Sequence, residues 1–172
     1  MSSELFMQML APTGGERILD IGAGKGKVAA KVMKASGGEV YAVEPNVKRF
    51  ESMKREFPAI KSSLAGAEGL PFADSYFDKV YTTMALHHFS DLDKALREVA
   101  RVLKPGGSFV VLEVEPDSGL GSLFKFFGRL VGEHMGMRTR GQLQARLESV
   151  GGFRVVRSEG QGSRYLIQAS RT

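Results

Sequence analysis

Short apolar runs and helical repeats alternate along this chain of 172 residues. The apolar runs predict strands at residues 18–21, 40–43, 60–64, 77–85 and 108–114. Apolar positions three and four residues apart predict helices at residues 4–10, 27–35, 47–57 and 91–104. Strands that alternate with helices in this way are typical of a parallel sheet with helices on both faces, the α/β class.

The pattern changes after residue 114. Helices are predicted at residues 119–131 and 141–149, and strands near 153–158 and 164–170 form a hairpin around Gly160 and Gly162. We therefore expect a Rossmann-like, doubly wound sheet of seven strands, mainly parallel with an antiparallel edge strand. The length suits one domain over residues 1–172.

The helix predicted at residues 91–104 has the clearest amphipathic pattern, with apolar residues on one side and charged pairs four residues apart on the other. Ser90 and Asp93 resemble a capping box at its start. The run Lys-Pro-Gly-Gly at residues 104–107 is expected to end this helix before the next strand.

A glycine-rich turn joins the first predicted strand to the helix that follows it. Gly22, Gly24 and Gly26 leave the backbone open to an approaching molecule, and the N–H groups of the helix start point into the turn. The spacing matches neither the dinucleotide-binding turn nor the phosphate-binding loop that ends in Gly-Lys-Ser/Thr. Glu44, at the end of the next strand, can accept hydrogen bonds from both hydroxyls of a ribose. These features indicate a nucleoside ligand.

The composition excludes several kinds of chemistry. There is no cysteine, which excludes disulfides, thiolate metal sites and thiol nucleophiles, and no histidine spacing indicates a metal site. The first residues lack the basic start and apolar run of a signal peptide, and no apolar stretch reaches the ~20 residues of a membrane span. We expect a cytoplasmic protein.

The net charge of +5 comes from the last third of the chain. Residues 1–116 hold fifteen basic and fifteen acidic side chains, whereas residues 117–172 hold nine basic and four acidic ones. Such an excess can attract nucleic acid or an anionic membrane, but arginines dispersed over an ordinary surface explain it more simply. Binding of nucleic acid is therefore disfavoured.

Three further motifs stand at residues 67–80 (AEGLPFADSYFDKV), 86–89 (LHHF) and 103–107 (LKPGG). Together with the glycine turn they resemble the class I S-adenosylmethionine-dependent methyltransferases, in particular the branch that includes the ubiquinone/menaquinone biosynthesis methyltransferases. The resemblance covers almost the whole chain. It implies S-adenosylmethionine as the cofactor, S-adenosylhomocysteine as its product and a small molecule as the methyl acceptor.

The resemblance implies that nine residues bind the cofactor: Asp20, Gly22, Ala23, Gly24, Glu44, Pro45, Ala67, Glu68 and Met84. Asp20 would attract the ammonium group, Glu44 would hold the ribose, and Glu68 would lie near the adenine edge. Each of these three carboxylates has a simpler interpretation as a cap of a neighbouring turn or helix. The family commonly has an acidic residue at the position of Gly66, so that adenine recognition here would depend more on Glu68.

His87 and His88 are the candidate catalytic residues, because they follow the fourth predicted strand, where this fold places its substrate. Either imidazole can accept a proton, and one of two adjacent histidines is expected to be structural. The chain lacks the Asn/Asp-Pro-Pro-Tyr/Phe segment with which base and glutamine methylases hold an amino group. The reactions that stay open are O-, N- or C-methylation of a small molecule.

Residues 117–140 are the candidate lid, and their leucines, phenylalanines and methionines would form an apolar wall for the acceptor. Only sixteen residues precede Arg17, where the stretch of the first strand and glycine turn begins, whereas relatives usually carry longer helical extensions there, so we expect an open cleft. A second subunit in a homodimer or a large acceptor would close it. Peripheral membrane contact through the basic helix at 119–131 is a weaker alternative.

Two other functions agree with parts of the sequence. A nicotinamide-dependent oxidoreductase would share the strand, turn and acidic residue, but the glycine spacing differs and no Ser/Tyr/Lys catalytic set is present. A non-catalytic S-adenosylmethionine-binding protein, such as a nucleic-acid-associated subunit, would keep every cofactor residue and stays open at this point.

Overall fold

A computed structural model of the chain describes residues 3–130 and 136–172. Its strands are β1 (Arg17–Ile21), β2 (Glu39–Val43), β3 (Lys61–Ser63), β4 (Phe77–Thr83), β5 (Leu103–Val114), β6 (Phe153–Gln161) and β7 (Arg164–Arg171). Its helices are α1 (Ser3–Leu10), α2 (Lys27–Ser36), α3 (Val47–Glu56), α4 (Leu92–Val102), α5 (Gly119–Leu130) and α6 (Arg140–Val150), with a 3-10 turn η1 (Leu86–His88). The predicted order of strands and helices is confirmed.

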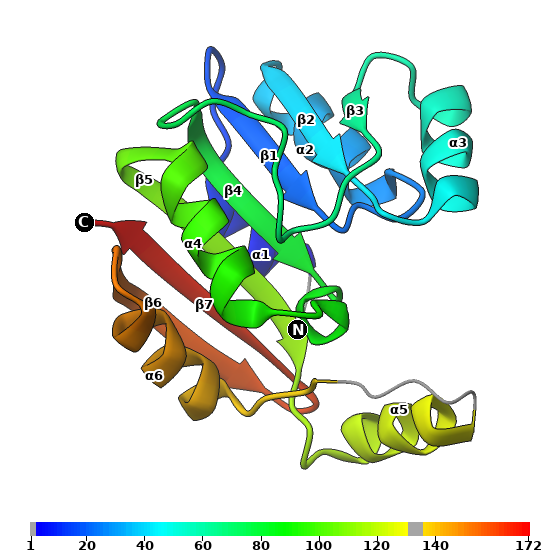
Figure 1. Cartoon of the computed structure of the whole chain (residues 1–172), viewed down its shortest axis with the longest axis vertical. Helices are drawn as coiled ribbons and strands as arrows, with labels where there is room; N and C mark the ends of the chain where they lie inside the picture. Colours follow the sequence, from blue (N-terminus) through cyan, green and yellow to red (C-terminus); the bar gives the residue numbers. More distant parts are fainter. Residues whose placement is uncertain (1–2, 131–135) are drawn as a thin grey trace.

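The strands form one seven-stranded sheet in the order β3-β2-β1-β4-β5-β7-β6 (Figure 1). The pairs among β3, β2, β1, β4 and β5 are parallel, and β7 is antiparallel to both of its neighbours, β5 and β6. The mainly parallel, Rossmann-like sheet with a terminal antiparallel hairpin is therefore confirmed. The strand order reverses between β1 and β4, which is where sheets of this kind leave a crevice outside the strand ends.

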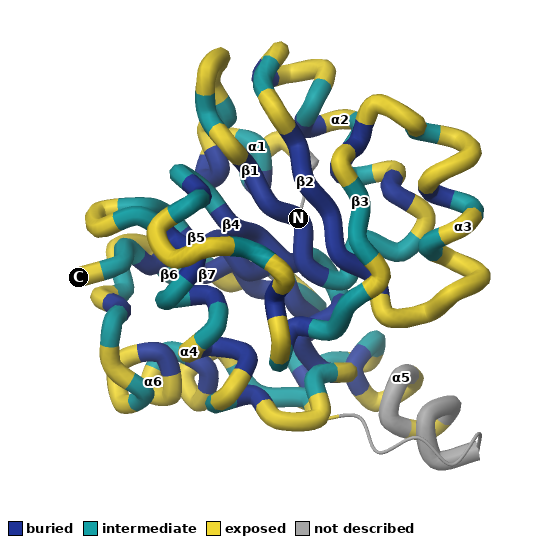
Figure 2. Tube along the Cα trace, turned by 45° about the horizontal axis from the view of Figure 1, so that its top comes forward, coloured by how far each residue is buried: buried dark blue, intermediate teal, exposed yellow. Residues whose placement is uncertain are grey.

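Helices cover both faces of the sheet. Apolar side chains of the central strands point alternately to the two faces, so that each face forms a hydrophobic core with the helices that pack on it. Ile18 of β1 belongs to the core under α1, α2 and α3, whereas its neighbour Leu19 belongs to the core under α4 and α6. Figure 2 shows the resulting pattern of buried strands and helices with exposed outer sides. Within the described residues, each helix is too short or too polar to cross a membrane.

One boundary differs from the sequence analysis. The strand β5 begins at Leu103, directly after α4, and includes the Lys-Pro-Gly-Gly run that was expected to separate the two elements. Leu103 pairs with Phe77, and the register of β4 and β5 then shifts before Lys79 pairs with Ser108. This irregularity accommodates the proline and the two glycines at the amino end of the strand, far from the carboxyl ends where a site is expected.

Candidate active site

A cavity of about 470 Å³ lies at the carboxyl ends of β1, β2 and β4. Seven residues singled out from the sequence line it: Gly22, Glu44, Pro45, Ala67, Glu68, Met84 and His88. Two other lining residues, Asn46 and Arg49, had not been indicated by any motif. A cavity of this volume is within the range of small-molecule and cofactor sites.

Gly22, at the start of the glycine turn, forms part of the cavity wall, whereas Ala23 and Gly24 are not among the residues that line it. The N–H groups of Gly22 and Ala23 donate to the carbonyl of Val43, over 2.9 and 3.1 Å. Gly22 has a φ of +75°, and a Cβ atom at this position would lie only 2.5 Å from the Cβ atom of Ala85. The packing therefore requires glycine here, and the turn keeps a bare backbone next to the cavity.

Glu44 ties the end of β2 to the glycine turn and to the start of α3. Its carboxylate is buried and accepts the N–H of Gly24 at 2.8 Å with one oxygen and the N–H of Asn46 at 3.0 Å with the other. The cap of α3 is Asn46, whose side chain accepts the N–H of Arg49. A carboxylate oxygen can accept two hydrogen bonds, and each oxygen of Glu44 accepts one here, so that Glu44 retains acceptor capacity.

Asp20 lies within the sheet, two residues before the glycine turn, and is almost fully buried. Neither of its carboxylate oxygens has a hydrogen-bond partner among the described residues, so it does not cap a turn. The pKa of Asp20 is raised to about 7, chiefly by burial; the nearby hydroxyl of Tyr81 acts to lower this pKa, and the charge of Glu44 acts to raise it. A buried carboxylate without a partner is costly, which makes Asp20 a candidate for holding a cationic group.

Glu68 supports the loop before α4. Its carboxylate accepts the N–H and hydroxyl of Ser90, at 2.7 and 2.9 Å, and the N–H of Asp91 at 3.3 Å. Partial burial acts to raise the pKa of Glu68, but these hydrogen bonds lower it below its usual value. The cap of α4 is Asp91, which accepts the N–H of Lys94; the predicted capping box of Ser90 and Asp93 was wrong, because Ser90 is engaged by Glu68.

The two candidate histidines lie in different surroundings. His87 is buried, and its Nδ1 atom lies 2.9 Å from a carboxylate oxygen of Glu113, which is also buried. The other oxygen of Glu113 accepts the N–H of Leu86 at 2.8 Å. His88 is exposed and lines the cavity, and the two imidazole rings are 4.3 Å apart between centroids. The structure therefore brings His88, and not His87, to the cavity.

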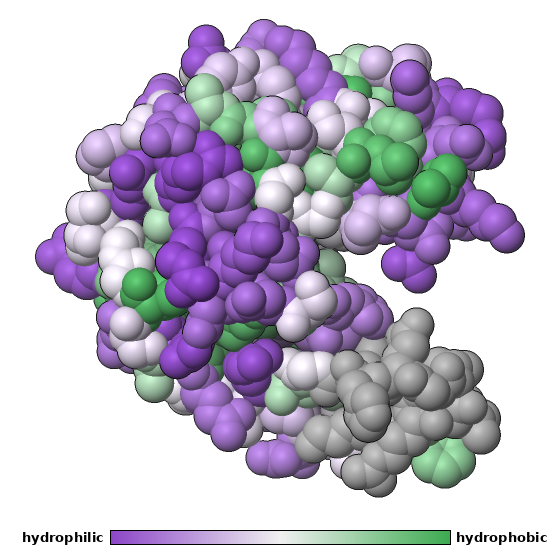
Figure 3. Space-filling model, in the orientation of Figure 1, coloured by the Kyte–Doolittle hydropathy of each residue, from purple (hydrophilic) through white to green (hydrophobic). Residues whose placement is uncertain are grey.

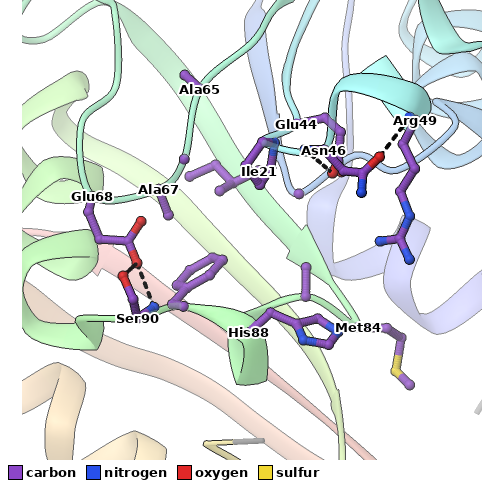
Figure 4. Close-up of a pocket in the computed structure, with 15 residues that line it drawn as sticks. Ile21, Glu44, Asn46, Arg49, Ala65, Ala67, Glu68, Met84, His88 and Ser90 are labelled. Carbon is purple, nitrogen blue, oxygen red and sulfur yellow. Dashed lines mark hydrogen bonds between the residues drawn. The ribbon is translucent and has the colours of Figure 1, made fainter. Parts of the chain in front are cut away.

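Met84 connects β4 to the turn that carries His88. Its φ is +55°, an unfavourable conformation for a residue with a side chain, and its N–H donates to the carbonyl of Leu112 at 2.8 Å. Such backbone strain is concentrated at functional sites. The strained residue lines the cavity on the side opposite Glu68 (Figure 4).

Comparisons with known proteins agree with this geometry. The model of the methyltransferase domain family matches residues 19–111, more than half of the chain. The ubiquinone/menaquinone biosynthesis C-methyltransferase of Rubrivivax gelatinosus is 37% identical over 109 residues, which make up 63% of this chain and 43% of that protein. The match thus spans less than half the length of this relative.

Two solved structures share the fold. The S-adenosylmethionine-dependent methyltransferase from Mesorhizobium loti has a TM-score of 0.84 and 22% identity, over 98% of this chain and 96% of that one. A methyltransferase in complex with the Haloferax volcanii Trm112 methyltransferase activator has a TM-score of 0.85 and 15% identity, over 96% of this chain and 88% of that one. From the family match, this chain belongs to the methyltransferase domain family, and its sheet has the fold of the two solved structures.

Proposed function

We propose that the chain transfers the methyl group of S-adenosylmethionine to a small-molecule acceptor in the cavity at the carboxyl ends of β1, β2 and β4. The observation that supports this best is the position of Glu44, a buried carboxylate with acceptor capacity at the wall of a 470 Å³ cavity beside a bare glycine turn. The related enzyme of Rubrivivax gelatinosus is named as a C-methyltransferase of ubiquinone and menaquinone biosynthesis, which also favours a small acceptor.

The described residues fit this cofactor. Asp20 is a buried carboxylate that lacks a hydrogen-bond partner, and it would balance the ammonium group. Glu44 would accept the ribose hydroxyls, with the turn from Gly22 to Gly24 beside the methionine part. Pro45, Ala67 and Glu68 would surround the adenine, and Met84 would contact the methionine end. Bound S-adenosylmethionine supplies an electrophilic methyl group on a positively charged sulfur.

The residues of the cavity contribute mainly by orientation. Displacement at a methyl group requires the nucleophile to approach opposite the leaving sulfur, so that holding both partners in line in a site that excludes water accounts for much of the rate. His88 is the histidine that lines the cavity in the described part of the chain, and an imidazole can take up a proton at neutral pH. We assign it as the group that takes the proton when the acceptor arrives protonated.

Replacement of Glu44 by glutamine is expected to weaken binding of S-adenosylhomocysteine by about 1.5–3 kcal/mol, because hydrogen bonds to a charged acceptor become hydrogen bonds to a neutral amide. Isothermal titration calorimetry measures this loss. Glu39→Gln is the matched control, since Glu39 lies at the opposite end of the same strand and does not line the cavity. Equal affinities of wild type and Glu44→Gln would remove Glu44 from the ribose site.

Replacement of His88 by alanine is expected to lower methyl transfer by roughly a hundredfold and to change the affinity for S-adenosylhomocysteine by less than about twofold. The assay follows labelled methyl groups from S-adenosylmethionine into the small-molecule fraction of a cell extract. His88→Asn keeps a polar side chain that does not titrate and should be equally slow. Normal transfer by either variant would show that the imidazole takes no proton.

We further propose that residues 1–172 act as one domain in which residues 117–140 form a lid. The helix α5 extends beyond the carboxyl side of the sheet (Figure 1), and its Leu123 and Phe126 are 51% and 63% exposed. The N–H of Gly136 donates to the carbonyl of His87 at 2.9 Å, which ties the far end of the segment to the turn that presents His88. Residues 131–135, with His134, lie outside the described residues. Alternatively, the second subunit of a homodimer would close the cavity.

A further inference from the structure

Arg49 reaches the cavity without a partner in the described part of the chain. It stands in the first turn of α3, where its backbone N–H is held by the side chain of Asn46. Its guanidinium extends from the helix into the open side of the pocket, on the side of Met84 and opposite Glu68 and Ser90 (Figure 4). Within residues 3–130 and 136–172 the guanidinium makes no hydrogen bond or ion pair.

The acidic side chains of the same cavity do not neutralise Arg49. Glu44 accepts the N–H groups of Gly24 and Asn46, and Glu68 accepts hydrogen bonds from Ser90 and Asp91. Neither carboxylate lies within ion-pair distance of the guanidinium. A sulfonium cofactor adds a positive charge to this pocket, and a second cation there is unfavourable unless an anion accompanies it.

The position of Arg49 on its helix also requires an explanation. The first turn of α3 contains Lys48 and Arg49 and no acidic residue, although the amino end of a helix carries a partial positive charge that disfavours cations. The surface around α3 is mostly hydrophilic, with hydrophobic atoms beside it (Figure 3). Arg49 and the helix end together produce a positive potential at the mouth of the cavity, which attracts an anion.

We propose that Arg49 binds a carboxylate or phosphate group of a molecule held in this cavity. The planar guanidinium donates two parallel N–H bonds to such an anion, an arrangement that lysine does not reproduce. The anion has two sources: the carboxylate of the cofactor's methionine part, or an acidic acceptor. The inference rests on the proposed function, since it takes the cavity to be the methyl-transfer site.

Calorimetric titration with S-adenosylhomocysteine and with 5′-methylthioadenosine distinguishes the first source. 5′-Methylthioadenosine keeps the adenosine part and lacks the amino-acid part. If Arg49 holds the cofactor carboxylate, Arg49→Ala and Arg49→Lys weaken the binding of S-adenosylhomocysteine by about tenfold or more. They leave the affinity for 5′-methylthioadenosine unchanged. Lys48→Ala is the matched control, because it removes the same charge from the same helix turn at a side chain that does not line the cavity.

The second source is tested with labelled S-adenosylmethionine and a small-molecule extract that has been separated by anion exchange. If Arg49 holds the acceptor, Arg49→Ala binds S-adenosylhomocysteine normally but labels acidic compounds about tenfold less than Lys48→Ala does. The proposal is overturned if Arg49→Ala and Lys48→Ala behave alike in both assays. Failure of the wild-type protein to bind S-adenosylhomocysteine at all would instead reject the proposed function, and the assignment of Arg49 with it.

Discussion

Replacing Asp20 with asparagine is expected to stabilise the cofactor-free protein at pH 8 by up to about 4 kcal/mol relative to wild type, and to leave the two proteins nearly equal at pH 4. The cause is the burial of a carboxyl group whose two oxygens lack hydrogen-bond partners in the described structure, which raises the pKa of Asp20 from 3.8 to about 7. Asparagine has a similar shape and carries no charge at any pH.

The sign of the effect follows from proton uptake. Between pH 3.8 and about 7 the folded protein holds a proton on Asp20 that the unfolded chain has lost, so that the free energy of unfolding of the wild type falls as the pH rises through this window. The fall is at most about 1.4 kcal/mol per pH unit. Asp20→Asn lacks this dependence. The difference between the two proteins therefore isolates the contribution of Asp20.

Urea denaturation of both proteins at pH 4, 5, 6, 7 and 8 measures this difference. Tyr81→Phe gives a second test, because the hydroxyl of Tyr81 lowers the pKa of Asp20 and its removal should move the transition to higher pH. Saturating S-adenosylhomocysteine should raise the free energy of unfolding of the wild type at pH 8. It should raise that of Asp20→Asn by less, since only the carboxylate balances the ammonium group. Parallel stability curves for wild type and Asp20→Asn would show that Asp20 ionises normally.

The parts of the site that lie on the parallel strands were predictable from the sequence. Gly22, Glu44 and Met84 each follow a strand whose apolar run is easily recognised, and the carboxyl ends of parallel strands meet at one edge of the sheet. Their positions along the chain therefore fix their positions in space. The family resemblance then supplied the chemical roles, which the substitutions above test.

The remaining parts depend on tertiary contacts that have no local signal. Whether Arg49 faces the cavity depends on the rotation of α3 about its axis, and Met53 is the buried residue that sets this rotation. Nor does the local sequence indicate which of the two adjacent histidines is buried. His87 is the buried one because it pairs with Glu113, a carboxylate 26 residues away in the otherwise apolar end of β5.

Glu113→Ala is expected to lower the free energy of unfolding by about 3–5 kcal/mol, because breaking a buried polar pair by removing one partner is strongly destabilising. The substitution would remove the acceptor of the Leu86 N–H and of His87 Nδ1 at once, and it would open a cavity beneath the turn that presents His88. Glu113→Gln should lower the free energy of unfolding much less. Its amide oxygen still accepts the Leu86 N–H, and its amide nitrogen donates to the other tautomer of His87.

Chemical denaturation of both variants at neutral pH, with nitrogen NMR of the imidazoles, separates these effects. In the wild type the proton of His87 should reside on Nδ1, toward the carboxylate, and in Glu113→Gln it should move to Nε2. Glu115→Ala is the control: it removes a half-buried carboxylate two residues further along the chain and should cost less than about 1 kcal/mol. A similar loss in both alanine variants would mean that His87 and the turn at Leu86–His88 are held by other contacts, so that the pair with Glu113 does not determine where His88 lies.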